Sequence, residues 1–306
     1  MPSTARIFDF LAAEAERGHR TALVTVTAVT GASVRNPGAH MAVSTSGDHA
    51  GSLSGGCIEA AVVAEALAAI AEGRPREVRF GADSPFIDIR LPCGGSVDLL
   101  ITPIVQTGWA RGIVGMQDRR EGVHLALDRA DHSPFAVRHA PRLRIVILGQ
   151  GASVAALAAL ARSIDTETTI FTPDPAIATS AGPSATLLQS TGQSVALPTD
   201  PWTAFAFFFH DHDWEVALLA QALCQPSLYV GAMGSHKTHA ARVLALREGG
   251  VGDDAIARIR APIGLIPSSR DPETLALSSL AEIVAAYNAS EPTRVSFPET
   301  SPVAQG

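Results

Sequence analysis

From residue 144 onward the chain alternates strand-like and helix-like segments, and this alternation constrains the fold more than any other feature. The runs RIVIL (144–148) and AFAFFF (204–209) are continuously apolar, as expected of central strands that helices cover on both faces. Strands that alternate with helices form a parallel sheet. The predicted strands are 144–148, 168–172, 205–209 and 228–231, and the predicted helices are 153–163, 214–223, 236–248 and 272–288. We therefore predict a Rossmann-like, doubly wound parallel-sheet domain over residues 143–290.

The first part of the chain predicts a smaller α/β domain over residues 1–130. An amphipathic N-terminal helix carries Ile7, Phe8, Leu11 and Ala15 on one stripe. Short β-branched runs at 23–29, 41–45 and 96–104, an alanine-rich helix at 58–72, a helix at 108–120 and a strand at 124–129 follow. The polar, proline-containing stretch 131–142 predicts a linker. The tail 291–306, rich in Pro, Ser and Thr, predicts disorder.

Charge and apolar patterning exclude some classes of partner. The chain holds 23 Lys and Arg against 30 Asp and Glu, a formal net charge of -7, and no segment concentrates the basic residues. Nucleic acid and anionic membranes are therefore not expected as partners. No apolar run approaches the roughly 18 residues that a membrane-spanning helix needs, and the three cysteines form no CxxC pair. We expect a soluble, cytoplasmic protein with reduced thiols.

Gly55, Gly56 and Cys57 lie directly before the alanine-rich helix, and Glu59 lies in its first turn. Two glycines before a helix let successive backbone N–H groups point at one spot, where the helix dipole adds positive potential. A cysteine at such a position favours its thiolate, which is a soft ligand for a transition metal. This pattern predicts an anion-binding loop with Cys57 as its thiol, although a lone cytosolic cysteine is more commonly a small buried apolar residue.

Cys93, Gly94 and Gly95 repeat the theme before the strand at 96–104. Cys57 and Cys93 could face one cavity, or Cys93 could be buried in a strand-entry turn; the residues leave both interpretations open. Cys224, at the end of an apolar helix, is expected in the core.

Three glycine or polar turns follow the predicted strands of the second domain. Gly149 and Gly151 follow RIVIL and favour a ligand at a helix start, although the dinucleotide fingerprint is incomplete and a bare turn is the alternative. His210 and Asp211 follow the strand at 205–209; we expect His210 or Asp211 to line a ligand cleft rather than bind zinc, and Asp213 to cap the next helix. Gly234 and Ser235 form another turn that could bind phosphate.

Taken in order, GSLSGGCIEAAV, the later CGG, FHDH, YVGAMGSHK and APIGLIPSSRDPETLALSSLAEI resemble the xanthine dehydrogenase accessory (XdhC/CoxI) family over nearly the whole chain. The resemblance carries the family's cysteines to Cys57 and Cys93, its acid to Glu59, its HD pair to His210 and Asp211, its GS turn to Gly234 and Ser235, and a later arginine and glutamate to Arg270 and Glu273. It implies a maturation factor rather than an enzyme.

Such a factor would bind molybdenum cofactor (molybdopterin), with Cys57 as a molybdenum ligand, and protect it. It would present the cofactor to a sulfurating enzyme such as a cysteine desulfurase and insert it into a xanthine dehydrogenase-type apo-molybdoenzyme. The resemblance and the apolar stripe with Phe8 and Leu11 also favour a homodimer, unless that helix packs within its own domain.

An NAD(P)-dependent oxidoreductase built on the second domain is the main alternative function. The incomplete fingerprint predicts weak nucleotide binding at most, and neither Tyr229 nor Tyr287 lies in a Tyr-x-x-x-Lys arrangement. A thiol or metal hydrolase that uses Cys57 and the FHDH turn lacks a nucleophile and base placed together by sequence.

Overall fold

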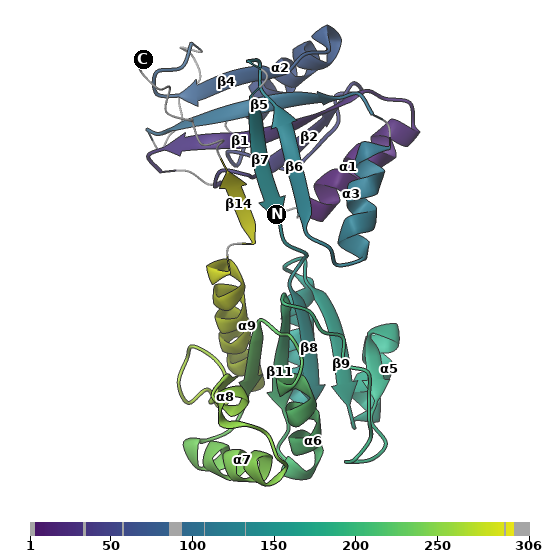
Figure 1. Cartoon of the computed structure of the whole chain (residues 1–306), viewed down its shortest axis with the longest axis vertical. Coiled ribbons are helices and arrows are strands. Elements are labelled where there is room, and N and C mark those ends of the chain that lie inside the picture. Colours follow the sequence, from purple (N-terminus) through teal and green to yellow (C-terminus); the bar gives the residue numbers. More distant parts are fainter. Residues whose placement is uncertain are drawn as a thin grey trace, which may run out of the picture. The chain divides into compact units, whose positions relative to one another are not determined.

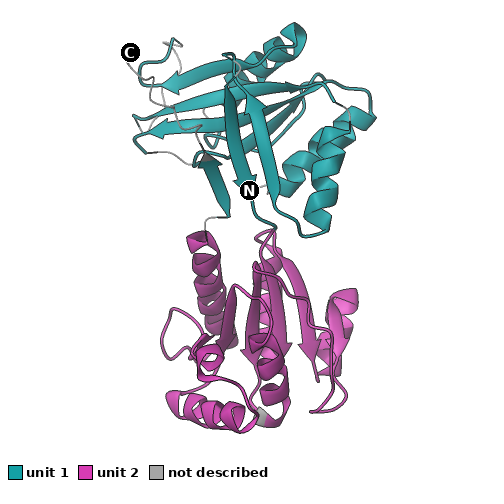
Figure 2. Cartoon of the chain, viewed as in Figure 1, with its two compact units in different colours: residues 1–141, 292–306 teal, residues 142–291 magenta. Residues whose placement is uncertain are grey.

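The computed structural model describes residues 4–32, 35–56, 58–85, 94–106, 108–131, 133–290 and 292–296, apart from the side chains of His212 and Ser296. Two predicted site residues, Cys57 and Cys93, lie outside the described residues. The chain divides into two compact units (Figure 2), the first formed by residues 1–141 and 292–306 and the second by residues 142–291. Each unit has its own sheet and core.

The second unit contains a six-stranded sheet with the order β10-β9-β8-β11-β12-β13 (Figure 1). Its strands are β8 (Arg144–Gly149), β9 (Glu167–Thr172), β10 (Ala185–Leu187), β11 (Thr203–Phe208), β12 (Tyr229–Ala232) and β13 (Ile259–Arg260). Every neighbouring pair is parallel. The chain runs outward from β8 to one edge and then from β11 to the other, so the strand order reverses between these two strands. The predicted doubly wound, Rossmann-like fold is confirmed.

Helices cover both faces of this sheet, as its continuously apolar strands require. Ile145 and Ile147 of β8 pack with α4 (Ala152–Arg162) and α9 (Pro272–Ala289) on one face. Val146 and Leu148 pack on the other face with α6 (His212–Leu223) and α7 (His236–Glu248). The shorter helices are α5 (Pro175–Ala181), α8 (Asp253–Ile256) and the 3-10 helix η1 (Gly182–Ser184). Because successive side chains alternate between the faces, one strand serves two cores.

The first unit is built on an antiparallel five-stranded sheet with the order β3-β2-β1-β5-β4. Its strands are β1 (Thr21–Thr30), β2 (His40–Ser44), β3 (His49–Ala50), β4 (Arg76–Gly81) and β5 (Ser96–Ile104). Helix α2 (Glu59–Glu72) packs on one face. Helices α1 (Thr4–Glu16) and α3 (Trp109–Asp118) pack on the other, together with a small sheet of β6 (Val123–Asp128), β7 (Pro134–His139) and β14 (Thr293–Ser296).

The structure corrects the predicted linker at 131–142 and part of the predicted disordered tail at 291–306. Residues 134–139 form β7, which pairs with β6, and residues 293–296 return to the first unit as β14 and pair with β7. Phe135, Val137 and His139 alternate as buried residues along β7. That alternation is a half-buried strand pattern which the intervening polar residues and the proline concealed.

The stripe on α1 packs within its own unit: Ile7, Phe8 and Leu11 are at most 1% exposed. The stripe therefore supplies no surface for a dimer, and the homodimer stays a prediction.

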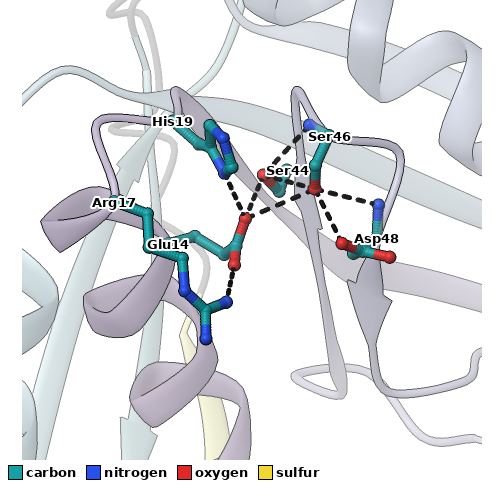
Figure 3. A network of polar contacts seen from close by, with 6 residues as sticks. All are labelled: Glu14, Arg17, His19, Ser44, Ser46 and Asp48. Atoms are coloured by element: carbon teal, nitrogen blue, oxygen red, sulfur yellow. Dashed lines mark hydrogen bonds and ion pairs between the residues drawn. The ribbon is translucent and has the colours of Figure 1, made fainter.

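A network of polar contacts centred on Glu14 fixes the end of α1 to β2 (Figure 3). The buried carboxylate accepts hydrogen bonds from Ser44 Oγ at 2.6 Å and His19 Nδ1 at 2.8 Å, and it pairs with Arg17. The Ser44 hydroxyl, the His19 ring and Arg17 hold the pKa of Glu14 at about 2 although burial opposes this. Because the carboxylate is satisfied by its own chain, this network is structural.

Candidate functional site

A cleft of about 810 Å³ opens in the second unit at the carboxyl ends of β8, β11 and β12. Residues of the turns that follow these strands, and of the segment after β13, line it. They include Gln150, Ala152, Ser153, His210, Gly234, Ser235 and the segment 262–272. Open α/β sheets bind ligands at this edge, next to the point where the strand order reverses. The cleft therefore lies where this fold class binds ligands.

The structure brings three of the predicted turns to this one edge. His210, Gly234 and Ser235 line the cleft directly, whereas Gly149 and Gly151 flank the lining residue Gln150. Asp211 is not among the lining residues. Its side chain instead accepts a hydrogen bond from the Asp213 backbone N–H at 3.0 Å and caps α6. The prediction that Asp213 is the cap is wrong, because Asp213 already lies inside the helix.

Gly149 and Gly151 are required for different reasons. A Cβ on Gly149 would lie 2.5 Å from the Phe208 carbonyl oxygen, so only glycine lets β8 run this close to the end of β11. Gly151 has open space around it but a φ of +84°, a backbone conformation that favours glycine. It precedes α4 and provides no side chain to cap the helix.

The α4 start differs from the other helix starts at the cleft edge. Helices α6, α7 and α9 begin with the side-chain caps Asp211, Ser235 and Asp271. Among these helices of the described second unit, only α4 begins without a side-chain cap. First-turn N–H groups without a cap are suited to an anionic ligand.

The segment 262–272 forms one wall of the cleft, and in the sequence only the resemblance to the XdhC/CoxI family indicates it. Buried Ser278 and half-buried Glu282 of α9 hold it: Gly264 N donates to Glu282 Oε2 at 2.6 Å, and Ile266 N donates to Ser278 Oγ at 2.7 Å. Arg270 is exposed and adds a cation to the lining. These anchors lie 12 and 18 positions further along the chain, on the helix that follows the segment, and the contacts form only when the segment folds back on that helix.

In the first unit, the loop before α2 is filled by the chain's own carboxylate. Glu59 Oε1 accepts hydrogen bonds from Ser52 Oγ at 2.7 Å and from the backbone N–H groups of residues 53 and 54 at 3.1 and 3.0 Å. Glu59 Oε2 accepts from Ser54 Oγ at 2.6 Å, Gly56 N at 2.9 Å and Ile58 N at 3.2 Å. These six donors use the acceptor sites of a carboxylate.

This arrangement corrects the predicted anion-binding loop. Gly56 N donates to Glu59 and Gly55 N donates to Ser52 Oγ at 3.1 Å. Both N–H groups therefore have partners within the chain, whereas the prediction requires them to be open to an anion. Burial raises the pKa of Glu59, but the hydroxyl groups of Ser54 and Ser52 and the loop N–H groups outweigh it and lower the pKa to about 2. Glu59 is therefore ionised at neutral pH and holds the backbone on both sides of residue 57.

The expectation that Cys224 lies in the core is wrong. It is exposed, at the residue after the last turn of α6. Among the described residues, no group of three or more His, Cys, Asp or Glu side chains is placed to hold a metal ion. Nor does any helix in the described ranges have the length and apolar character needed to cross a membrane.

Two buried histidines of the first unit escaped the sequence analysis. His40 Nε2 lies 2.8 Å from His139 Nε2, and their other ring nitrogens contact Thr25 Oγ1 at 2.9 Å and Thr293 Oγ1 at 3.1 Å. Burial lowers the pKa of His139 to about 4 and, with the neighbouring His139 and Arg35, lowers that of His40 well below its usual value. The pair joins β2, β7 and β14, so it is a structural contact.

Fold and cleft together define a two-unit α/β protein in which a Rossmann-type domain opens a polar cleft at the carboxyl ends of its strands. Two family models match the chain, the XdhC Rossmann domain over residues 145–283 and the XdhC and CoxI family over residues 14–81. The molybdenum cofactor insertion chaperone PaoD of Escherichia coli (strain K12) is 34% identical over 281 residues, which cover 87% of this chain and 83% of PaoD. The chain belongs to the XdhC and CoxI family, as its motifs indicated.

Two further similarities are more distant or partial. The uncharacterized protein YqeB of the same organism is 30% identical over 258 residues, which cover 82% of this chain but 40% of YqeB. A crystal structure described as a xanthine dehydrogenase from Bacillus halodurans has a TM-score of 0.75 and 18% identity, covering 96% of this chain and 98% of that one. At this identity the likeness shows a shared fold.

Proposed function

We propose that the chain binds molybdenum cofactor, protects it and inserts it into a xanthine dehydrogenase-type apo-molybdoenzyme. The observation that carries this proposal is the 34% identity to a protein named as a molybdenum cofactor insertion chaperone, over most of both chains. It agrees with our expectation of a maturation factor rather than an enzyme. Presentation to a cysteine desulfurase, a cytoplasmic location and a homodimer belong to the same proposal.

The cleft of the second unit is suited to the anionic part of the cofactor. Molybdopterin carries a phosphate, and the cleft offers the uncapped start of α4 and the exposed cation of Arg270. A helix start combined with an arginine is a favourable phosphate site. His210, Gly234 and Ser235 are proposed to line the same site.

The loop before α2 in the first unit is a second candidate site for the cofactor. Because Glu59 occupies the N–H groups of residues 53, 54, 56 and 58, this loop does not offer them to a phosphate. We therefore assign Glu59, with Gly55 and Gly56, to holding the loop in shape, and Cys57 to supplying a thiolate to molybdenum. Cys93 is proposed to assist.

Two substitutions test these assignments in protein that is co-expressed with the enzymes of cofactor synthesis. Arg270→Ala and Cys57→Ala should each lower the molybdenum and pterin content of the purified protein and its activation of an apo-molybdoenzyme, with circular dichroism unchanged. The matched controls are Arg247→Ala, at an exposed arginine of α7 that pairs with Asp253, and Cys224→Ala; neither should change the cofactor content or the activation. A wild-type protein free of molybdenum and pterin would refute the proposed function.

The oxidoreductase alternative gains no support from the second unit. Asp174, the acid nearest the end of β9, accepts hydrogen bonds from the N–H groups of residues 176 and 177 and caps α5. A dinucleotide site usually keeps an acid in this region for the ribose. We therefore expect weak nucleotide binding at most, and steady NADH turnover with a panel of carbonyl substrates would contradict that expectation.

A further inference from the structure

A fully buried ion pair lies directly behind two of the turns that line the cleft. Arg242 of α7 donates from Nε to Glu215 Oε2 at 2.9 Å and from Nη2 to Glu215 Oε1 at 3.0 Å. Both side chains are 0% exposed. Glu215 lies in the first turn of α6, directly after the turn that carries His210. The pair is bidentate, which fixes both the distance and the relative orientation of the two helices at this point.

The same guanidinium also reaches the second turn. Arg242 Nη2 donates to the Met233 carbonyl oxygen at 2.7 Å, and Met233 is the residue between β12 and Gly234. Helices α6 and α7 pack side by side in the second unit (Figure 1). Arg242 thus connects the first turn of α6 with the backbone just before Gly234 and Ser235.

Stability alone explains this pair poorly. Taking two charges out of water is costly, and buried pairs can often be replaced by apolar residues of similar volume without loss of stability. The Arg242 guanidinium is not fully satisfied either, because its Nη1 has no hydrogen-bond partner within the described part of the chain. A costly, incompletely satisfied pair at this place is better explained by the geometry that it imposes.

We infer that Glu215 and Arg242 are positioning residues that hold the His210 turn and the Gly234-Ser235 turn at a fixed separation for ligand binding. This inference rests on the proposed function of the cleft as a cofactor site. Neither residue lines the cleft. Their effect on the ligand is therefore indirect, through the Met233 carbonyl and the start of α6.

The decisive variant is the double substitution Glu215→Leu with Arg242→Met, which removes the bridge without leaving an unpaired buried charge. We expect amide hydrogen exchange at residues 209–213 and 233–236 to become about tenfold faster, and cofactor release from the loaded protein to accelerate by about the same factor. The midpoint of urea unfolding should stay close to that of the wild type. Wild-type exchange and release rates in the folded double variant would overturn the inference.

Two further variants complete the experiment. Arg242→Lys keeps the charge but cannot reproduce the three hydrogen bonds of the guanidinium, so it should show the same local effects. It replaces the double variant in the test if that variant does not fold. Arg144→Met is the matched control: Arg144 pairs with Glu167 and Asp200 at the amino end of the sheet and should leave both turns unchanged. If the wild type carries no cofactor, the proposed function fails, while the exchange rates still decide whether the bridge positions the turns.

Discussion

The loop before α2 and the turn before α4 look alike in sequence but differ in what their backbone N–H groups bind. Each places glycines immediately before an alanine-rich helix. In the first, Glu59 folds back and accepts hydrogen bonds from the loop N–H groups. The second ends at Gly151, which provides no side-chain cap for α4, and it borders an open cleft. The difference teaches that glycines before a helix create a site for an anion, and that a neighbouring acid decides whether the site is already filled.

The largest expected effect on the free energy of unfolding comes from substitution of the glycines in these two regions. Gly149→Ala should lower the free energy of unfolding by about 3–5 kcal/mol, because the added Cβ would overlap the Phe208 backbone, which cannot move aside. Gly151→Ala, Gly55→Ala and Gly56→Ala meet no atom within 4 Å and should cost about 1–2 kcal/mol each, from positive φ alone. Urea unfolding monitored by circular dichroism measures all four. Similar losses for Gly149 and Gly151 would contradict the steric difference.

Removing Glu59 should make the first loop resemble the second. Glu59→Ala should destabilise the first unit by about 2–3 kcal/mol, since several hydrogen bonds to a charged acceptor are lost and water replaces only part of them. The freed N–H groups should then donate hydrogen bonds to inorganic phosphate, so phosphate should raise the melting temperature of the variant. The wild-type first unit should not respond, since Glu59 is already in place. A variant that phosphate leaves unchanged would show that the loop collapses without its carboxylate.

Acid should distinguish the two units through the buried histidines. The pKa of His139 is lowered from an ordinary 6.5 to about 4, so the fold favours the neutral ring. This contribution to stability is present above pH 6.5 and is lost as the pH falls toward 4; between pH 7 and 5 it should amount to about 2 kcal/mol. Amide exchange should accelerate in β7 and β14 more than in β8 and β11.

His139→Phe supplies the control for the acid response. It removes one titrating ring while keeping a buried aromatic side chain, so the dependence of exchange in β7 and β14 on pH between 7 and 5 should become shallower. An unchanged slope would place the acid sensitivity elsewhere in the unit.

The smallest expected effect concerns the helix caps of the second unit. Asp211→Ala removes the cap of α6 and leaves this helix start uncapped, as α4 already is. It should cost about 1 kcal/mol. Cys224→Ala, at the exposed opposite end of the same helix, should change stability by less than about 0.5 kcal/mol. Equal effects of the two substitutions would mean that the Asp211 hydrogen bond contributes nothing measurable.

Most of the fold followed from local patterns, and the exceptions have identifiable causes. The alternation of strands and helices predicted the parallel sheet and the helices that cover it. The strands β10 and β13 were missed because they contain only three and two residues and their pattern is too short to detect. The sequence predicts a linker in place of β7 because the proline and the charged residues of this strand mask its buried alternation.

The candidate site was predictable only in part. The glycine and histidine turns could be placed at one edge of the sheet because all of them follow parallel strands. The wall formed by residues 262–272 depends on Ser278 and Glu282, and the buried histidine pair joins residues 99 positions apart. Contacts of this kind leave no periodicity in the sequence.

By itself, the sequence of this protein determined its family, its alternation of strands and helices and the positions of its glycine turns, because backbone conformation and hydrophobic periodicity are local properties. Only the tertiary structure decided which of those turns is filled, where the C-terminal strand pairs and which buried charges meet. These outcomes depend on side-chain directions and on long-range contacts, and a hydrogen-bond donor is satisfied by whichever acceptor the fold brings within about 3 Å of it.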